Sequence, residues 1–281
     1  MVKAIRIHEF GEADVLKWED IDVGEPGPGQ LRLRHTVIGF NFLDIMVRKG
    51  LYPVLPELPS VLGTEAAGVV EAVGAGVEGF DGGQRVAYAS TFPGSYAEGR
   101  LIEAAQVVAL PDDVSDEAAA ASMLKGMTAE YLIHRTYAAQ SGETALVHAA
   151  AGGVGLFLCQ WLASKGVNVI GTVGSEAKKE TIDALRPRGY MVNFGNASGP
   201  LPPIDSVELN VKGSLFFTKA SMRFYQLNRQ ELDDSAATLF AAIAAGDIAP
   251  VIGQTYKLED AAQAQIDVWG GKTTGSTILT V

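Results

Sequence analysis

The chain has 281 residues, of which 22 are Lys or Arg and 33 are Asp or Glu, so its formal net charge is −11. This charge repels phosphate backbones and anionic membranes, and we expect neither a nucleic acid nor a membrane as partner. The only cysteine is Cys159, which excludes an internal disulfide and a cysteine-based zinc cluster. The sequence contains no unbroken apolar run of about 18 residues, so it predicts no membrane span. We therefore expect a cytoplasmic protein.

The first part of the chain, to about residue 120, predicts short β-strands separated by turns. Runs at 31–37, 67–74 and 85–88 have the composition and alternation of strands, and glycine and proline interrupt the sequence between them, as at Gly27-Pro28-Gly29. Regularly spaced short strands favour a compact barrel or sandwich.

The pattern changes near Ser115, which is a good N-cap for an alanine-rich helix, and a second helix is predicted over 128–137. An apolar strand at 144–149, a glycine-rich turn, a helix ending at Gly166 and a second buried strand at 167–173 then form a βαβ unit. Further strands are predicted at 190–194 and 214–218, a helix at 231–245, and a last strand at 276–281 that returns to the first domain.

The turn of the βαβ unit resembles a dinucleotide-binding loop. Its sequence runs Ala150-Ala151-Gly152-Gly153-Val154-Gly155 between a predicted strand and a predicted helix. Small residues there allow a sharp turn, close approach of the backbone to a pyrophosphate and tight helix packing, while the N–H groups at the helix start face the phosphates. We expect Ala151, Gly152, Gly153 and Val154 to bind the cofactor; the alternative is a tight turn without a ligand.

The end of the second strand favours NADPH over NADH. NAD-selective sites place an acidic residue there, whereas this chain has Gly174 and Ser175, with no acid before Glu176. These small residues leave room for a 2′-phosphate, and Lys178 is expected to supply positive charge. Glu176 argues against this interpretation, and Lys178 as an ordinary surface lysine is the alternative.

Several motifs, taken in order along almost the whole chain, carry a resemblance to a known family. They are Gly39-Phe40-Asn41-Phe42-Leu43-Asp44, Arg48-Lys49-Gly50-Leu51-Tyr52-Pro53, Gly63-Thr64-Glu65-Ala66-Ala67-Gly68, Leu124-Lys125-Gly126-Met127-Thr128, His148 to Gly155, Asn193 to Gly199, Leu209 to Ser214 and Thr274-Gly275-Ser276. The sequence resembles the zinc-independent, ζ-crystallin-like quinone oxidoreductases of the medium-chain dehydrogenase/reductase superfamily.

The resemblance implies an α/β protein of two domains. A GroES-like, β-rich catalytic domain would comprise residues 1–120 and 251–281, and a Rossmann-type, doubly wound nucleotide-binding domain would comprise 121–250. It also implies a homodimer through the cofactor domains, with 214–218 as the pairing edge strand. An edge covered by a helix of the same chain is the alternative.

The same resemblance implies the chemistry and the site. NADPH would reduce a quinone by hydride transfer, with Asn41 and Tyr52 beside the nicotinamide and the acceptor; Asn41 as a backbone cap and Tyr52 as a packed turn residue are the alternatives. The cofactor residues would include Lys125, Thr128, Phe194, Gly195 and Asn196. Lys272 lies next to Gly271, where the family carries an arginine, and Met46 replaces a family tyrosine.

The zinc-dependent branch of the superfamily is disfavoured on chemical grounds. Its members hold the metal with a cysteine and a Gly-His-Glu segment, and at those places this chain has Asn41 and Thr64. The remaining ligands cannot surround a zinc ion with an open position. We therefore expect no metal.

The cofactor domain is shorter than its fold requires. Only residues 174–190 separate the second strand from the next recognisable one, although one βαβ unit takes about 30 residues. The missing segment would fall between Glu180 and Thr181 and would include the strand beside the glycine-loop strand. Either the sequence omits these residues or a real deletion impairs the cofactor site.

Two other functions remain open at this point. One is an NADPH-dependent reductase of enone or alkenal double bonds on the same scaffold. The other is a cofactor-binding protein with little turnover.

Overall fold

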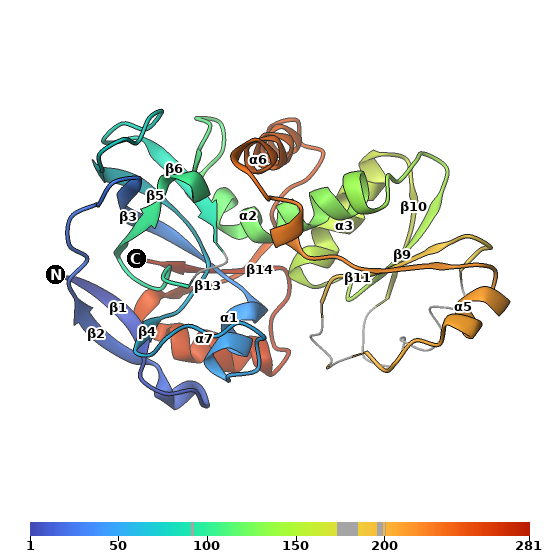
Figure 1. Ribbon diagram of the computed structural model, residues 1–281, viewed down its shortest axis with the longest axis horizontal. Coiled ribbons are helices and arrows are strands. Elements are labelled where there is room, and N and C mark those ends of the chain that lie inside the picture. Colours follow the sequence, from blue (N-terminus) through green and yellow to red (C-terminus); the bar gives the residue numbers. More distant parts are fainter. Residues whose placement is uncertain (91–92, 173–184, 196–198, 200) are drawn as a thin grey trace.

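A β-rich lobe contains both ends of the chain, and an α/β lobe lies beside it (Figure 1). The computed structural model describes residues 1–90, 93–172, 185–195, 199 and 201–281. The strands of the β-rich lobe are β1 (Val2–Ile7), β2 (Lys17–Ile21), β3 (Gln30–Phe40), β4 (Ser60–Val61), β5 (Glu65–Val73), β6 (Arg85–Ala89), β7 (Gly99–Glu103), β8 (Val108–Ala109), β13 (Ile252–Lys257) and β14 (Ser276–Thr280).

These strands form two sheets around one core. The larger has the order β13-β14-β3-β5-β6-β8, with β7 also paired to β3, and the smaller has the order β2-β1-β4. The long strand β3 alternates buried and less buried residues over its first half, as its sequence pattern predicts. Helices α1 (Phe42–Arg48) and α7 (Ala261–Trp269) belong to this lobe, and the C-terminal strand β14 joins its sheet as expected.

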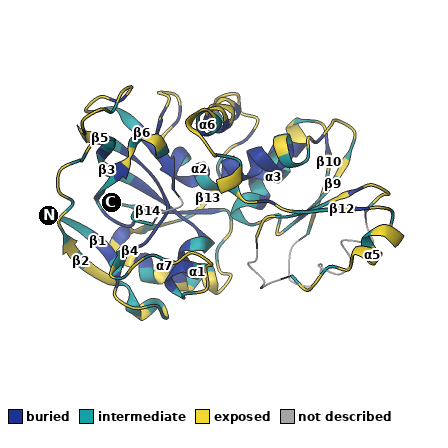
Figure 2. Ribbon diagram, in the orientation of Figure 1, coloured by how far each residue is buried: buried dark blue, intermediate teal, exposed yellow. Residues whose placement is uncertain are grey.

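One buried helix, α2 (Asp116–Tyr131), joins the two lobes (Figure 2). The Ser115 side chain accepts a hydrogen bond from the N–H of Ala118, which confirms the predicted helix start. The helix packs against β3, β5, β6 and β14 on one side and against the α/β lobe on the other. It approaches β3 so closely that a Cβ atom on Gly39 would lie 2.2 Å from the carbonyl oxygen of Ala120.

The α/β lobe is built on two short parallel pairs of strands. Strand β9 (Thr144–His148) pairs in parallel with β10 (Asn168–Thr172), and the helix α3 (Gly153–Ser164) connects the two strands. This arrangement confirms the predicted βαβ unit. Strand β11 (Tyr190–Asn193) pairs with β12 (Phe216–Lys219). The helix α5 (Ser206–Val211) precedes β12, and α6 (Arg229–Ala244) packs on α2.

Three details differ from the sequence predictions. The helix predicted at 128–137 is not separate, because α2 continues into a π-helical turn over Leu132–Thr136. Strand β12 begins two residues later than expected. Strand β10 was expected to be buried, yet Ile170 at its middle is 55% exposed.

The sheet of the α/β lobe is interrupted where the missing segment was predicted. Within the described residues, β9 pairs only with β10, and β11 pairs only with β12, so the two pairs are not hydrogen-bonded to each other. A doubly wound sheet is continuous, and one further strand between β9 and β11 would join the halves.

Across the described ranges, no helix is both long and apolar enough to span a lipid bilayer.

Candidate active site

The glycine loop lies between β9 and α3, with Gly152 as the N-cap of the helix. A Cβ atom on Gly155 would lie 2.2 Å from the carbonyl oxygen of Ala149, so this position requires glycine for the close approach of helix and strand. Val154 packs against the core of the lobe, whereas Ala151 is exposed. The helix α3 therefore begins with the half-buried glycine backbone of Gly152 and Gly153, the kind of helix start at which phosphate groups can bind.

The loop contacts the β-rich lobe directly. The N–H of Gly275 donates to the carbonyl oxygen of Ala151 (3.2 Å), and Gly152 and Gly275 form an isolated parallel bridge. Gly275 has a φ of +67° and comes close to the carbonyl of Val251, so both its conformation and its space favour glycine. The glycine loop thus lies at the boundary between the lobes.

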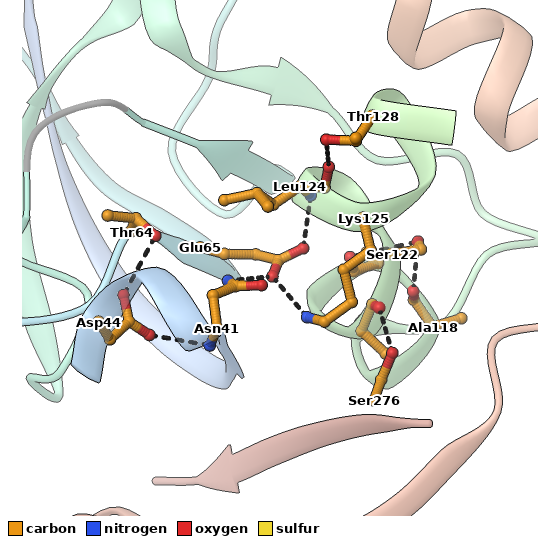
Figure 3. A network of polar contacts seen from close by, with 12 residues as sticks. Asn41, Asp44, Thr64, Glu65, Ala118, Ser122, Leu124, Lys125, Thr128 and Ser276 are labelled. Carbon is orange, nitrogen blue, oxygen red and sulfur yellow. Dashed lines mark hydrogen bonds and ion pairs between the residues drawn. The ribbon is translucent and has the colours of Figure 1, made fainter. Parts of the chain in front are cut away.

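Asn41, at the start of α1, is buried at the same boundary (Figure 3). Its side-chain Nδ2 donates to Oε2 of Glu65 (2.7 Å), and Nζ of Lys125 donates to the same oxygen (3.2 Å). The other oxygen of Glu65 accepts from the N–H of Leu124 (2.6 Å). Glu65 is completely buried, and it joins β5 of one lobe to α2.

A second buried carboxyl, that of Asp44, lies on the other side of Asn41. It accepts from the backbone N–H of Asn41 (2.9 Å), the hydroxyl of Tyr96 (3.0 Å) and the hydroxyl of Thr64 (3.3 Å). Burial raises the pKa of Asp44 to about 7, although the hydrogen bonds from Asn41 and Tyr96 oppose this rise. Asn41 therefore forms a capping box with Asp44 at the start of α1, while its side-chain Nδ2 donates to Glu65.

The other predicted site residues lie in varied surroundings. Tyr52 is 37% exposed on the loop after α1, and Phe194 and Gly195 follow β11 with open space around Gly195. Thr128 is buried and donates to the carbonyl of Leu124 within its own helix. Lys272 follows α7 on the surface, where its Nζ lies 3.1 Å from Asp267. Four predicted cofactor residues lie outside the described residues: Gly174, Ser175, Lys178 and Asn196.

The structure links Asn41 to the glycine loop through Glu65 and Lys125. Asn41 and Lys125 donate to the same oxygen of Glu65, and a Cβ on Gly153 would lie 2.8 Å from Cδ of Lys125. Sequence reasoning did not assign a role to Glu65 or Asp44. Each of these two acidic residues stands at the start of an apolar strand or helix, and this position could have indicated a role. An acidic residue is rarely buried there without a hydrogen-bonding or charged partner. Among the described residues, no group of three or more His, Cys, Asp or Glu side chains is arranged to hold a metal ion.

The close approach at Gly155 gives a testable expectation. Gly155→Ala should lower the free energy of unfolding by about 1–3 kcal/mol, because the new methyl group must push α3 away from Ala149. It should also weaken dinucleotide binding, since the helix start moves. Chemical denaturation and a binding titration check both effects. Gly142→Ala is not a suitable control because of its positive φ, whereas Gly82→Ala, in open space, should change neither quantity.

Comparisons with known proteins agree with this geometry. The family model of the alcohol dehydrogenase GroES-like domain matches residues 27–141, and that of the zinc-binding dehydrogenase domain matches residues 148–279. A quinone oxidoreductase from Pseudomonas aeruginosa is 40% identical, with 99% of each chain covered. A 2-haloacrylate reductase from a Burkholderia species is 39% identical, again with 99% of each chain covered. The solved structure of Escherichia coli quinone oxidoreductase complexed with NADPH has a TM-score of 0.94 at 36% identity, covering 99% of this chain and 100% of that one.

A GroES-like domain combined with a Rossmann-type cofactor domain defines a medium-chain dehydrogenase/reductase. Within that superfamily, this chain belongs to the quinone oxidoreductase family. It is shorter than its relatives: the alignment with the Pseudomonas aeruginosa protein spans 324 positions, whereas this chain has 281 residues. Because nearly all of both chains align, the missing positions are internal, in agreement with the predicted shortening of the cofactor domain.

Proposed function

We propose that this chain reduces quinones with NADPH by hydride transfer and without a zinc ion. One observation carries the proposal: a glycine loop between a strand and a helix contacts Lys125, which shares the buried Glu65 with Asn41. The chain around this site is 40% identical to a quinone oxidoreductase along its whole length. Residues 121–250 would bind the cofactor, and residues 1–120 with 251–281 would complete the substrate side of the cleft.

The residues of the chain would orient the reactants and stabilise charge. NADPH, when bound, supplies the hydride. The start of α3 would hold the pyrophosphate through backbone N–H groups, and Lys125, Thr128, Phe194, Gly195 and Asn196 would line the nicotinamide end. Tyr52 would donate a hydrogen bond to the acceptor oxygen on which negative charge develops, and Asn41 would orient the nicotinamide ring.

The site chemistry supports zinc independence and a preference for NADPH. Asn41 and Thr64 donate hydrogen bonds to carboxylates at the positions where the zinc-dependent branch carries metal ligands, and a neutral amide and a hydroxyl are poor ligands for zinc. The small residues Gly174 and Ser175 would leave room for a 2′-phosphate, and Lys178 together with the exposed Lys272 would supply positive charge.

Turnover with NADPH and a soluble benzoquinone tests the proposal. The purified chain should oxidise NADPH when the quinone is added, and Tyr52→Phe should lower kcat at least about tenfold, because a donor to the developing oxyanion is lost. Tyr190→Phe is the matched control, since Tyr190 on β11 is 39% exposed and lies in the other lobe. Full activity of Tyr52→Phe would remove the role given to Tyr52.

A second candidate function has a specific observation in its favour. The 2-haloacrylate reductase is nearly as similar as the first quinone oxidoreductase, and an activated alkene accepts hydride at carbon as a quinone does. A higher kcat/KM for 2-haloacrylates or enones than for quinones would favour this function. Tight NADPH binding with no turnover of either acceptor would indicate a cofactor-binding protein instead.

We further propose a cytoplasmic homodimer formed through β12. Phe216 on this strand is 49% exposed, and in the described part of the chain β12 pairs on one side only. A two-fold contact would satisfy the open edge and bury the aromatic side chain. Phe216→Lys should therefore give a monomer in light scattering, whereas Ile170→Lys on the exposed strand β10 should leave a dimer. A monomeric unaltered chain would contradict this assembly.

A further inference from the structure

Glu65 has no role in the function proposed above, yet it accepts three hydrogen bonds at the boundary between the lobes (Figure 3). We propose that Glu65 is the positioning residue for Asn41. Its carboxylate holds the Asn41 amide with the NH2 group inward, so that the amide oxygen is left at the other end. This inference rests on the proposed function, because it deepens the part that Asn41 plays there.

The chemistry of the two groups fixes the orientation. A carboxylate only accepts hydrogen bonds, whereas the amide of Asn41 has a donor end and an acceptor end. Glu65 Oε2 lies 2.7 Å from Nδ2, so only the NH2 group can face it. The backbone N–H of Asn41 is held separately by Asp44, which prevents the residue from turning as a whole. A carboxylate so deeply buried is tolerated because Lys125 neutralises it.

The orientation is set from α2, the helix that joins the two lobes. Both other donors to Glu65, the N–H of Leu124 and Nζ of Lys125, belong to α2, and the Lys125 stem lies against Gly153 of the glycine loop. A chain of contacts therefore leads from the cofactor loop through Lys125 and Glu65 to Asn41. The oxygen end of Asn41 faces the backbone N–H of Asp44 in the capping box of α1. An amide oxygen can accept a second hydrogen bond, which suits an N–H donor such as a primary carboxamide on the ligand.

Glu65→Gln isolates this effect because glutamine keeps the shape but has only one accepting end. The backbone N–H of Leu124 cannot turn, so it should take the oxygen of the introduced glutamine, which leaves the new NH2 group facing Nδ2 of Asn41. The Asn41 amide should then rotate and present NH2 where the oxygen was. We expect kcat to fall on the order of 10- to 100-fold, with a smaller change in KM for NADPH.

Exchanging the carboxylate and the amide between positions 65 and 41 should restore part of kcat. A purely structural role of Glu65 does not predict this recovery. Asn41→Asp alone places two carboxylates beside one ammonium and should also lose activity. When Glu65→Gln and Asn41→Asp are combined, the NH2 group of the introduced glutamine donates to the introduced aspartate, whose second oxygen again faces outward as an acceptor. The kcat of this double variant should be at least about tenfold higher than that of the worse single variant, which corresponds to direct coupling between the two side chains.

Glu130→Gln is the matched control. Glu130 is also a buried carboxylate on α2, bound by Arg135 and Ser235, but its partners lie away from Asn41. The Glu130→Gln variant should have a lower free energy of unfolding, while its kcat stays close to that of the unaltered chain. A loss of kcat equal to that of Glu65→Gln would overturn the proposal, because general loosening of α2 would then explain both.

A second measurement separates this inference from the function itself. The side-chain amide signal of Asn41 in a nitrogen-15 NMR spectrum, identified by its loss in Asn41→Asp, should shift in Glu65→Gln and stay unchanged in Glu130→Gln. An unaltered chain that reduces no quinone would refute the proposed function, yet the NMR comparison would still decide the orientation. An unchanged Asn41 signal in Glu65→Gln, or a double variant no better than the worse single one, would overturn the inference.

Discussion

Inserting the internal segment of the Pseudomonas aeruginosa relative between Glu180 and Thr181 should stabilise the protein by about 5 kcal/mol or more. A new strand between β9 and β11 would supply backbone partners to two strand edges and cover apolar surface on both faces of the sheet. The melting temperature should rise by roughly 10 °C, and NADPH affinity should increase because the sheet that supports the glycine loop becomes continuous.

A glycine-serine insert of equal length at the same junction is the control. It restores the length of the chain but brings no apolar side chains and no strand propensity, so it should lower stability slightly through loop closure. If both inserts gave the same melting temperature, the separation of the β9–β10 and β11–β12 pairs would not be the weakness that the topology indicates. Calorimetry and a fluorescence titration with NADPH are sufficient measurements.

Asp44→Asn should change how stability depends on pH. The pKa of Asp44 in the folded state is about 7, raised by burial, whereas the carboxyl titrates near its ordinary value, about 4, in the unfolded chain. Asp44 therefore contributes stability at low pH that is lost as the pH rises towards 7. Relative to the unaltered chain, the variant should gain about 1 kcal/mol per pH unit across this window.

Denaturant unfolding at several pH values between about 4.5 and about 8 checks this slope. Asp20→Asn removes an exposed carboxylate that pairs with Lys3 and serves as the control for loss of charge alone. Parallel stability curves for Asp44→Asn and the unaltered chain would show that Asp44 titrates in the folded protein much as it does in the unfolded one.

Much of the fold could be predicted because local signals were strong. The N-cap at Ser115, the alternation along β3 and the strand–glycine–helix pattern at 144–166 are each set by short-range chemistry, and the structure confirms all three. The exposure of β10 could not be predicted in the same way. The sequence of β10 is mainly apolar, as is typical of a strand covered on both faces. Whether the strand is actually covered depends on chain segments that are far away in the sequence.

The residues of the candidate site also divide into those that the sequence could predict and those that it could not. The glycine loop follows from its own spacing, and resemblance identifies Asn41. Glu65 and Asp44 could not be recognised as partners of Asn41, because the sequence alone does not show that the start of β5, the start of α1 and the middle of α2 meet. Asp44 is three residues from Asn41, but Leu124 is 59 residues from Glu65, and tertiary packing alone brings such a pair together.

The chain passes between the lobes at two places, along α2 and again near Ala249. At the second crossing, the side chain of Gln160 on α3 donates to the carbonyl of Ala249 and accepts from its N–H. These two hydrogen bonds fix the chain to α3 at this point. The lobes also touch where Gly275 contacts the glycine loop, but a hinge motion bends the chain mainly at its covalent connections between two rigid bodies. We therefore expect any rotation of one lobe against the other to take place about the line from α2 to Ala249, where the chain connects the lobes.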